Sequence, residues 1–219
     1  MRALPKPIAR PGARLGEAHR RPDTRDRLLQ VAQALFAERG YRGTSLRDIS
    51  ARIGIKAPSL LHHFASKDAL YLAVLDRIFI RLEAAAGSMA AGPGSHRERI
   101  ERGVGSAIDF IAARPHFDRI MWNEFIDDKS VGRQMLKRRV PPLFNAMVDF
   151  IREGQQQGEF RPEVDPFHFV MSLISVTIGY FTTGAVVRRI WNTDLLDGPT
   201  MERRKREVAD MVERTLFKV

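Results

Sequence analysis

The stretch TSLRDISARIGIKAPSLLHHFASKD, residues 44–68, decides the fold of this chain. Ser45 is a suitable helix N-cap, and Asp48 stands three residues later, where the acidic residue of a capping box belongs. Apolar residues then recur at helical spacing up to Gly54, a residue that tolerates the left-handed conformation of a sharp turn. The pattern predicts a two-turn helix that ends at this glycine.

A second short helix is predicted directly after the turn. Pro58 suits the first turn of a helix, and Leu60 and Phe64 fall on the side that would face a core. The opposite side exposes Ala57, Ser59, Leu61, His62 and His63. Two short helices joined by a tight turn are typical of a helix-turn-helix, and helices of this length need further packing to persist in water.

Both flanks of this pair are predicted to supply that packing. Upstream, residues 24–39 form an apolar stripe that closes at Gly40, made of Leu28, Leu29, Ala32, Leu35 and Phe36. Downstream, Ser66 caps a predicted helix over residues 67–86. Lys67 lies in the first turn of that helix, where the helix dipole disfavours a cation, and a nearby phosphate would account for it.

Taken in order, the 24–40 helix, the pair around Gly54, and HHF at 62–64 followed by SKDAL at 66–70 resemble the TetR family of bacterial transcriptional regulators. The resemblance covers roughly residues 24–75. It implies a sequence-specific DNA-binding regulator, and we expect a homodimeric repressor released from its operator by a small molecule. It also implies a DNA face lined by Ser45, Arg47, Lys56, Ala57, Pro58, Ser59, Leu61, His62, His63 and Lys67.

The residue types on this face suggest separate roles. Hydroxyl and imidazole groups can bond base edges, which favours Ser59, His62 and His63 for sequence reading. Ser45 and Lys67 are expected at phosphates, and Arg47 suits either role. The family usually has Tyr at position 61 and commonly Ser at 56, where this chain has Leu and Lys. Its half-site preference is therefore not carried over.

Charge supports a polyanionic partner for the same part of the chain. Residues 1–70 hold 14 Lys and Arg against 6 Asp and Glu, so most of the net charge of +10 lies there. Neutralising phosphates releases counterions and gives affinity without sequence preference. A solvated basic face is the alternative.

The chain divides into three predicted parts. Residues 1–23, with six basic residues and four prolines, form a flexible arm that either follows DNA or is an unstructured leader. Residues 24–70 form the DNA-binding domain. Residues 71–219 form a larger helical domain for ligand binding and dimerisation, beyond a small-residue joint at 87–96. The predicted fold class is all-α.

Helices are predicted in the larger domain over 97–113, 116–126, 142–157, 166–187 and 199–217. Pro141 and Pro142 predict a break or kink before the third of these. Residues 166–187 lack charge, but their Ser, Thr and His content argues against a membrane span and for a helix buried on most sides. Its small residues and the amphipathic last helix predict a symmetric dimer interface, and hence a near-palindromic operator in double-stranded DNA.

Bulky residues on these helices predict a mostly apolar pocket for a neutral or amphipathic effector. The candidates are Phe79, Phe110, Phe117, Met121, Trp122, Phe125, Phe144, Met147, Met171, Ile174 and Phe181, with His116, Asn145, Tyr180 and His168 as polar neighbours. A solid core is the alternative for each residue. Glu124, Asp127 and Asp128 are read as a helix end that faces solvent.

No catalytic motif and no metal-ligand spacing is present, so neither an enzyme nor a cofactor is predicted. The absence of cysteine is compatible with a cytoplasmic protein. A helical carrier or enzyme with an incidental basic end remains the rival hypothesis.

Overall fold

The computed structural model describes residues 24–114, 117–127 and 129–218, and within these residues it contains helices and no named strand. This confirms the predicted all-α class. The predicted arm, residues 1–23, lies outside the described residues. The helices are α1 Thr24–Arg39, α2 Leu46–Ile53, α3 Ala57–His63, α4 Lys67–Ala91, α5 His96–Ala112, α6 Phe117–Ile126, α7 Arg133–Gln156, α8 Pro166–Trp191 and α9 Gly198–Leu216.

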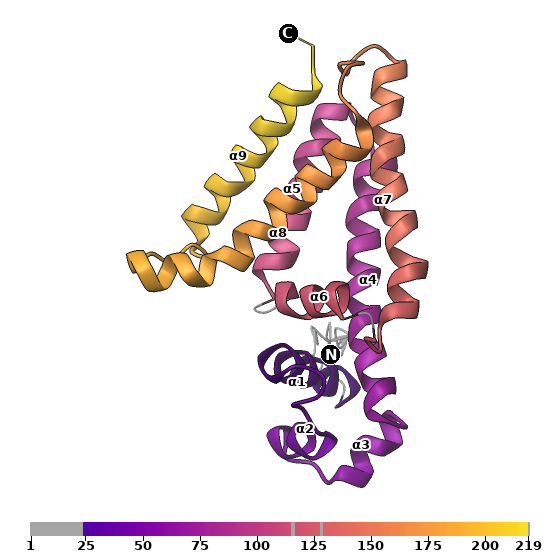
Figure 1. Ribbon diagram of the computed structural model, residues 1–219, viewed down its shortest axis with the longest axis vertical. Coiled ribbons are helices and arrows are strands. Elements are labelled where there is room, and N and C mark those ends of the chain that lie inside the picture. The colour runs from indigo at the N-terminus through magenta and orange to yellow at the C-terminus, as the bar shows by residue number, and fades with distance from the viewer. Residues whose placement is uncertain (1–23, 115–116, 128, 219) are drawn as a thin grey trace, which may run out of the picture.

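Helices α1 to α3 form a small unit at one end of the molecule (Figure 1). The predicted capping box at Ser45 is present, and Gly54 ends α2 in the left-handed conformation, with φ 79°. The apolar stripe of α1, together with Leu60 and Phe64, is buried in one core against the first turns of α4. This packing stabilises helices that are too short to persist alone.

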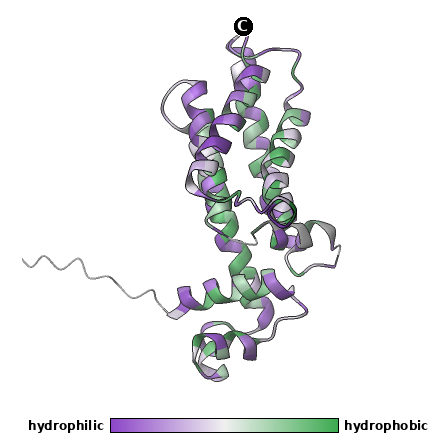
Figure 2. Cartoon of the chain, turned by 90° about the vertical axis from the view of Figure 1, so that its left-hand side faces the viewer, coloured by the Kyte–Doolittle hydropathy of each residue, from purple (hydrophilic) through white to green (hydrophobic). Residues whose placement is uncertain are grey.

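Helix α4 runs from this unit into the rest of the molecule, and its connecting stretch is mostly hydrophobic (Figures 1 and 2). The prediction of a joint from residue 87 is wrong, because the helix continues to Ala91. Met89 is buried, and its Cβ lies so close to Gly103 that a Cβ there would come within 2.8 Å of it. Packing of Met89 against α5 therefore stabilises the last turns of α4, although these turns are rich in small residues. The division at residue 70 stays a prediction, since α4 passes through it.

The larger part is a helical bundle in which α4 packs against α5 and α7. Helix α6 lies across the lower end of this bundle, next to α1, and α8 and α9 extend to one side (Figure 1). A second core, centred on Phe160 and Val170, joins α5, α7, α8 and α9.

A break or a kink is predicted at the prolines, and the break is wrong. Pro141 and Pro142 both lie inside α7, which is one assigned helix. Their missing N–H groups would have bonded the carbonyls of Lys137 and Arg138, and both of those residues are exposed. Water can therefore satisfy the two carbonyl groups, and packing against α4 holds the helix together.

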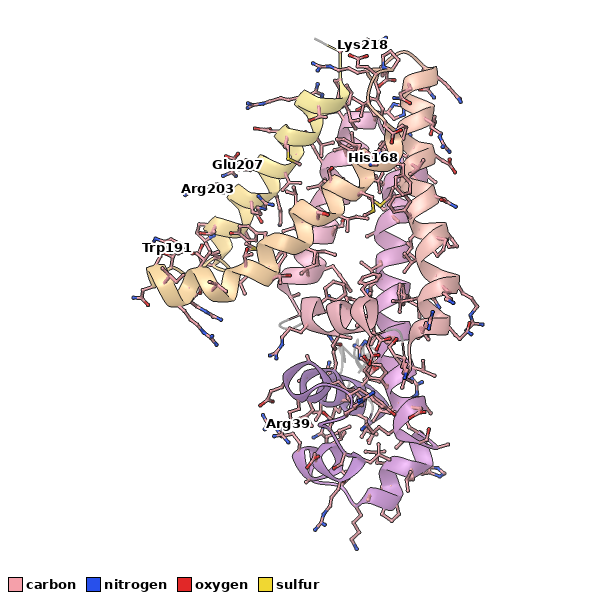
Figure 3. All side chains as sticks on the ribbon, viewed as in Figure 1. Arg39, His168, Trp191, Arg203, Glu207 and Lys218 are labelled. Atoms are coloured by element: carbon pink, nitrogen blue, oxygen red, sulfur yellow. The ribbon has the colours of Figure 1, made fainter. Side chains whose placement is uncertain are left out.

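Helix α8 differs most from its prediction. By length and composition, Pro166–Gly184 could cross a membrane, yet only 6% of this window is buried within the chain. Val170 is fully buried, whereas large apolar side chains along the rest of α8 are exposed: Phe167, Met171, Val176, Val186, Ile190 and Trp191. Trp191 lies at the outer end of α8 (Figure 3). The expectation of a helix buried on most sides is wrong for the single chain.

Gly154→Ala should destabilise the fold, because a Cβ at this position in α7 would overlap the ring of Phe160, which is fully buried. We expect a loss of about 1–3 kcal/mol in the free energy of unfolding, measured by urea denaturation. Gly105→Ala is the control, because a Cβ there meets no atom within 4 Å. Because Gly105 lies within helix α5, the control should raise the free energy of unfolding by roughly 0.5–1 kcal/mol. Equal effects of the two substitutions would contradict this packing.

Candidate DNA-reading site and ligand cavity

Helices α1 to α3 form what we call the reading unit, and hydrogen bonds at Ser45 fix the start of α2 within it. The Ser45 hydroxyl donates to Asp48 Oδ2 over 2.6 Å and accepts from the Asp48 N–H over 3.1 Å, and the Ser45 N–H donates to Oδ2 over 2.9 Å. These bonds to Ser45 hold the pKa of Asp48 below its usual value. Ser45 is thus a structural cap, and its predicted phosphate contact stays a prediction.

Helix α3 presents one exposed face beyond this cap. Its exposed residues are Ala57, Pro58, Ser59, Leu61, His62 and His63. Leu61 has 46% of its surface exposed, which is high for a large apolar side chain in a short helix. The two imidazoles stand edge to face with ring centres 5.9 Å apart. Arg47 and Lys56 are also exposed, on the neighbouring elements.

Lys67 stands at the start of α4, and the structure places its ammonium over an aromatic ring. Its Nζ lies 4.1 Å from the centre of the Tyr41 ring, an attractive cation–π contact. The Tyr41 hydroxyl in turn donates to Asp68, and burial followed by this hydrogen bond raises the pKa of Tyr41 to about 12. The Tyr41 ring, itself bonded to Asp68, therefore gives the half-buried Lys67 a favourable contact without requiring a phosphate.

A buried hydrogen bond links this unit to α6, and sequence reasoning missed it. The Tyr71 hydroxyl of α4 donates to Glu124 Oε1 over 2.6 Å. Burial, and then the bond to Glu124, raise the pKa of Tyr71 well above its usual value, so the hydroxyl keeps its proton. Glu124 has only 6% of its surface exposed, so the expectation that it faces solvent is wrong. Asp127 is exposed, as expected.

Gly132 makes room for the Glu124 carboxylate. A Cβ at position 132 would overlap Glu124 Oε2 and the side chain of Leu75. An acidic residue inside the hydrophobic pattern FDRIMWNEFI was the available signal for a buried carboxylate, but its tyrosine partner is 53 residues away.

An apolar cavity of about 210 Å³ lies among α4, α5, α6, α7 and α8. Its walls include seven residues of the predicted pocket, whose binding of a ligand stays a prediction: Phe79, Phe117, Met121, Phe125, Phe144, Met147 and Ile174. The remaining wall is also apolar apart from Thr177. Phe125 lines the cavity although 55% of its surface is exposed, so its ring stands at an edge of the cavity.

Three predicted residues do not line this cavity. Phe110 lies behind it, with its ring 5.2 Å from that of Phe117 and the Arg114 guanidinium 4.1 Å above it. Met171 points from α8 into solvent, and Phe181 lines a second cavity one turn beyond Ile178. The helical spacing could not show which residues of α8 face the cavity, because α8 has apolar residues on all its sides. The side chain of Trp122 lies outside the described part of the structure.

Three of the four predicted polar neighbours are also absent from its walls. His168 and Asn145 are exposed, and the Tyr180 hydroxyl donates instead to the Leu195 carbonyl over 3.3 Å. His116 is outside the described residues. In the described ranges 24–114, 117–127 and 129–218, no three His, Cys, Asp or Glu side chains are placed to share a metal ion.

Two family descriptions match the chain. Residues 28–74 match the description "Bacterial regulatory proteins, tetR family", and residues 97–212 match "Tetracyclin repressor-like, C-terminal domain". The first match covers the helix-turn-helix and the second covers more than half of the chain. The rival hypothesis of a helical carrier or enzyme with an incidental basic end is therefore wrong.

Individual relatives agree with this assignment. The chain is 29% identical over 180 residues to the HTH-type transcriptional repressor KstR2 of Mycobacterium tuberculosis, covering 73% of this chain and 82% of that protein. It is 45% identical over 170 residues to the repressor ComR of Escherichia coli, covering 71% and 76%.

Solved structures show the same fold. The structure of M. tuberculosis KstR2 superposes with a TM-score of 0.74 at 24% identity, over 92% of this chain and 99% of that one. AibR, solved in complex with isovaleryl coenzyme A and operator DNA, gives a TM-score of 0.65 at 21% identity, over 86% and 95%. The chain belongs to the TetR family of bacterial transcriptional regulators, which bind DNA and are not enzymes.

Proposed function

We propose that this regulator is a cytoplasmic homodimeric repressor whose α3 helices read a near-palindromic operator and which a ligand with an apolar part releases. The observation that carries the proposal is the arrangement of α6. This helix lines the apolar cavity with Phe117, Met121 and Phe125, and its Glu124 accepts a hydrogen bond from Tyr71 of α4, whose ring packs on Phe36 of α1.

The DNA contacts divide by chemistry. Ser59, His62 and His63 occupy the exposed face of α3, where hydroxyl and imidazole groups can reach base edges in the major groove. Lys67 and Lys56 supply cations for phosphates, and Arg47 can bond either. Ala57, Pro58 and Leu61 offer apolar contacts, for instance to thymine methyl groups.

A dimer would cover the exposed face of α8. An uncharged segment with several exposed large apolar side chains is unusual for a monomer in water. Ser172, Ser175, Gly179 and Thr183 lie close to one helical side, where their small size lets a second helix approach. A two-fold axis beside α8 would place two reading units on successive turns of one DNA face.

Ligand release would act through α6. A ligand that spreads the cavity shifts Phe117 and Met121, and α6 cannot move without disturbing the buried Tyr71–Glu124 bond or the contact with α1. The ligand then favours the conformation whose reading units are wrongly spaced. Linkage requires that operator DNA weaken ligand binding by the same factor. In the AibR complex a coenzyme A thioester is the bound small molecule, which is compatible with a ligand of mixed polarity.

Lys67→Ala should weaken binding to all DNA sequences about equally, because a phosphate contact has no sequence preference. We expect the slope of log affinity against log salt to fall by roughly one unit per lost contact, measured by fluorescence anisotropy at several salt concentrations. Lys137→Ala is the matched control, since Lys137 is exposed on α7 in the larger part. A Lys67 variant with an unchanged salt slope would contradict the assignment.

His63→Ala should relax sequence preference instead. Loss of a base contact removes about 1–3 kcal/mol of discrimination at one base pair and leaves the affinity for unrelated DNA nearly unchanged. Selection of bound sequences from random duplex DNA, run in parallel for both proteins, measures this. Identical selected sequences would rule out base reading by His63.

Gly179→Arg should give monomers that bind the operator poorly. A Cβ at Gly179 meets no atom within 4 Å, so the substitution does not clash within the chain, yet it places a charge on the proposed interface. Gly87→Arg is the control, because this exposed glycine of α4 is equally unobstructed. Light scattering should show a monomer only for the first variant. A monomeric wild type at micromolar concentration would end the dimer proposal.

A further inference from the structure

A second cavity, of about 500 Å³, lies between the end of α5, the start of α6 and the last turns of α8. Four arginines line it, Arg114, Arg119, Arg188 and Arg189, against one acidic residue, Asp194. One Asp194 carboxylate oxygen already accepts the Leu196 N–H over 3.0 Å. The cavity therefore has an excess of three positive charges, and none of its arginines is among the predicted pocket residues.

Three of these arginines are available to a ligand. Arg119, Arg188 and Arg189 are exposed, and none forms an ion pair or a side-chain hydrogen bond with the residues that the structure describes. Arg114 is held in place, because its Nη1 donates to the Phe110 carbonyl over 2.9 Å. Burial, and then the positive charges of Arg81 and Arg77, lower the pKa of Arg114. The positive field thus extends beyond the arginines that line the cavity.

The cationic cavity adjoins the apolar one. Ile111 lines both, and successive turns of α8 line first the apolar cavity, with Ile174, Thr177 and Ile178, and then the cationic one, with Phe181 and Arg188. At a rise of about 1.5 Å per residue, Ile178 and Arg188 are roughly 15 Å apart along the helix. That length suits a ligand whose apolar end and charged end occupy neighbouring spaces.

We infer that the cationic cavity is a binding site for a multiply charged, phosphate-bearing head group, attached to an acyl or similar apolar group that enters the adjoining cavity. This inference rests on the proposed ligand-release function and names the ligand class. It differs from the expectation, drawn from the sequence, of a neutral or amphipathic ligand. A single carboxylate would neutralise one guanidinium, whereas several phosphate oxygens can each accept charge-assisted hydrogen bonds from the arginines.

The cationic cavity also includes a residue of α6, the helix through which we propose that the ligand acts. Arg119 belongs to α6, on the side opposite Phe117, so the head group and the apolar group would contact the same short helix from two sides. Operator DNA is the other polyanion in the system, but the cavity lies in the larger part of the molecule, away from α3 (Figure 1).

The test uses acyl coenzyme A thioesters of four to sixteen carbons as probes, each with the matching free fatty acid, together with coenzyme A alone. Isothermal titration calorimetry on the full chain measures their affinities. We expect the preferred thioester to bind more tightly than its free acid and than coenzyme A. The Arg188→Ala/Arg189→Ala variant should bind that thioester at least about tenfold more weakly, since two charge-assisted contacts are lost.

The matched control is Lys137→Ala/Arg138→Ala, which removes the same charge from the exposed face of α7 and touches neither cavity. It should bind the thioester like the wild type, and light scattering should give all three proteins the same mass. The inference is overturned if no thioester binds, if the free acid binds as tightly as its thioester, or if the arginine variant binds like the control.

Operator binding without any probe, followed on the same preparations, separates this inference from the proposed function. A wild type that binds no DNA would reject the proposed function whatever the thioesters do. A thioester that binds through Arg188 and Arg189 but leaves the operator bound would support the site and reject its part in release.

Discussion

The hydrogen bond from Tyr71 to Glu124 is the constraint on which the two-part structure depends. Both groups are buried, and a buried polar group without a partner costs about 1–3 kcal/mol, so breaking the bond is expensive for either helix. Tyr71 also packs on Phe36 and Tyr41, with ring centres 4.8 and 4.9 Å away. The position of α6 is therefore tied to the core of the reading unit rather than only to the bundle.

Helix α4 extends this link from the reading unit to the apolar cavity. One helix carries Lys67 at its start, Tyr71 in its second turn, and Phe79 and Met89 in the wall of the apolar cavity. A continuous helix transmits a tilt along its whole length, because its backbone bonds leave no flexible joint between these residues. Extension of α4 past residue 86 is thus a functional property as well as a packing detail.

Helix α8 serves two surfaces at once. One side lines both cavities, and other sides carry exposed apolar residues that a partner subunit would cover. A ligand that displaces α8 from either cavity would then also change the geometry of the dimer. The absence of charge between residues 166 and 187 suits the apolar cavity and the exposed apolar face, where an unpaired charge is costly, and the charged part of α8 begins at Arg188, beside the cationic cavity.

The sequence by itself determined the reading unit, because its signals are local. The Ser45 cap, the left-handed Gly54 and the apolar spacing of α1 act within a few residues of one another, so the motif could be placed almost to the residue. The cavity could be predicted only in part, since an all-apolar helix such as α8 does not show which side faces inward. Tertiary structure alone decided the Tyr71–Glu124 bond and the meeting of Arg114 and Arg119 with Arg188 and Arg189. These groups are distant in sequence, and only the packing of α4, α5, α6 and α8 brings them together.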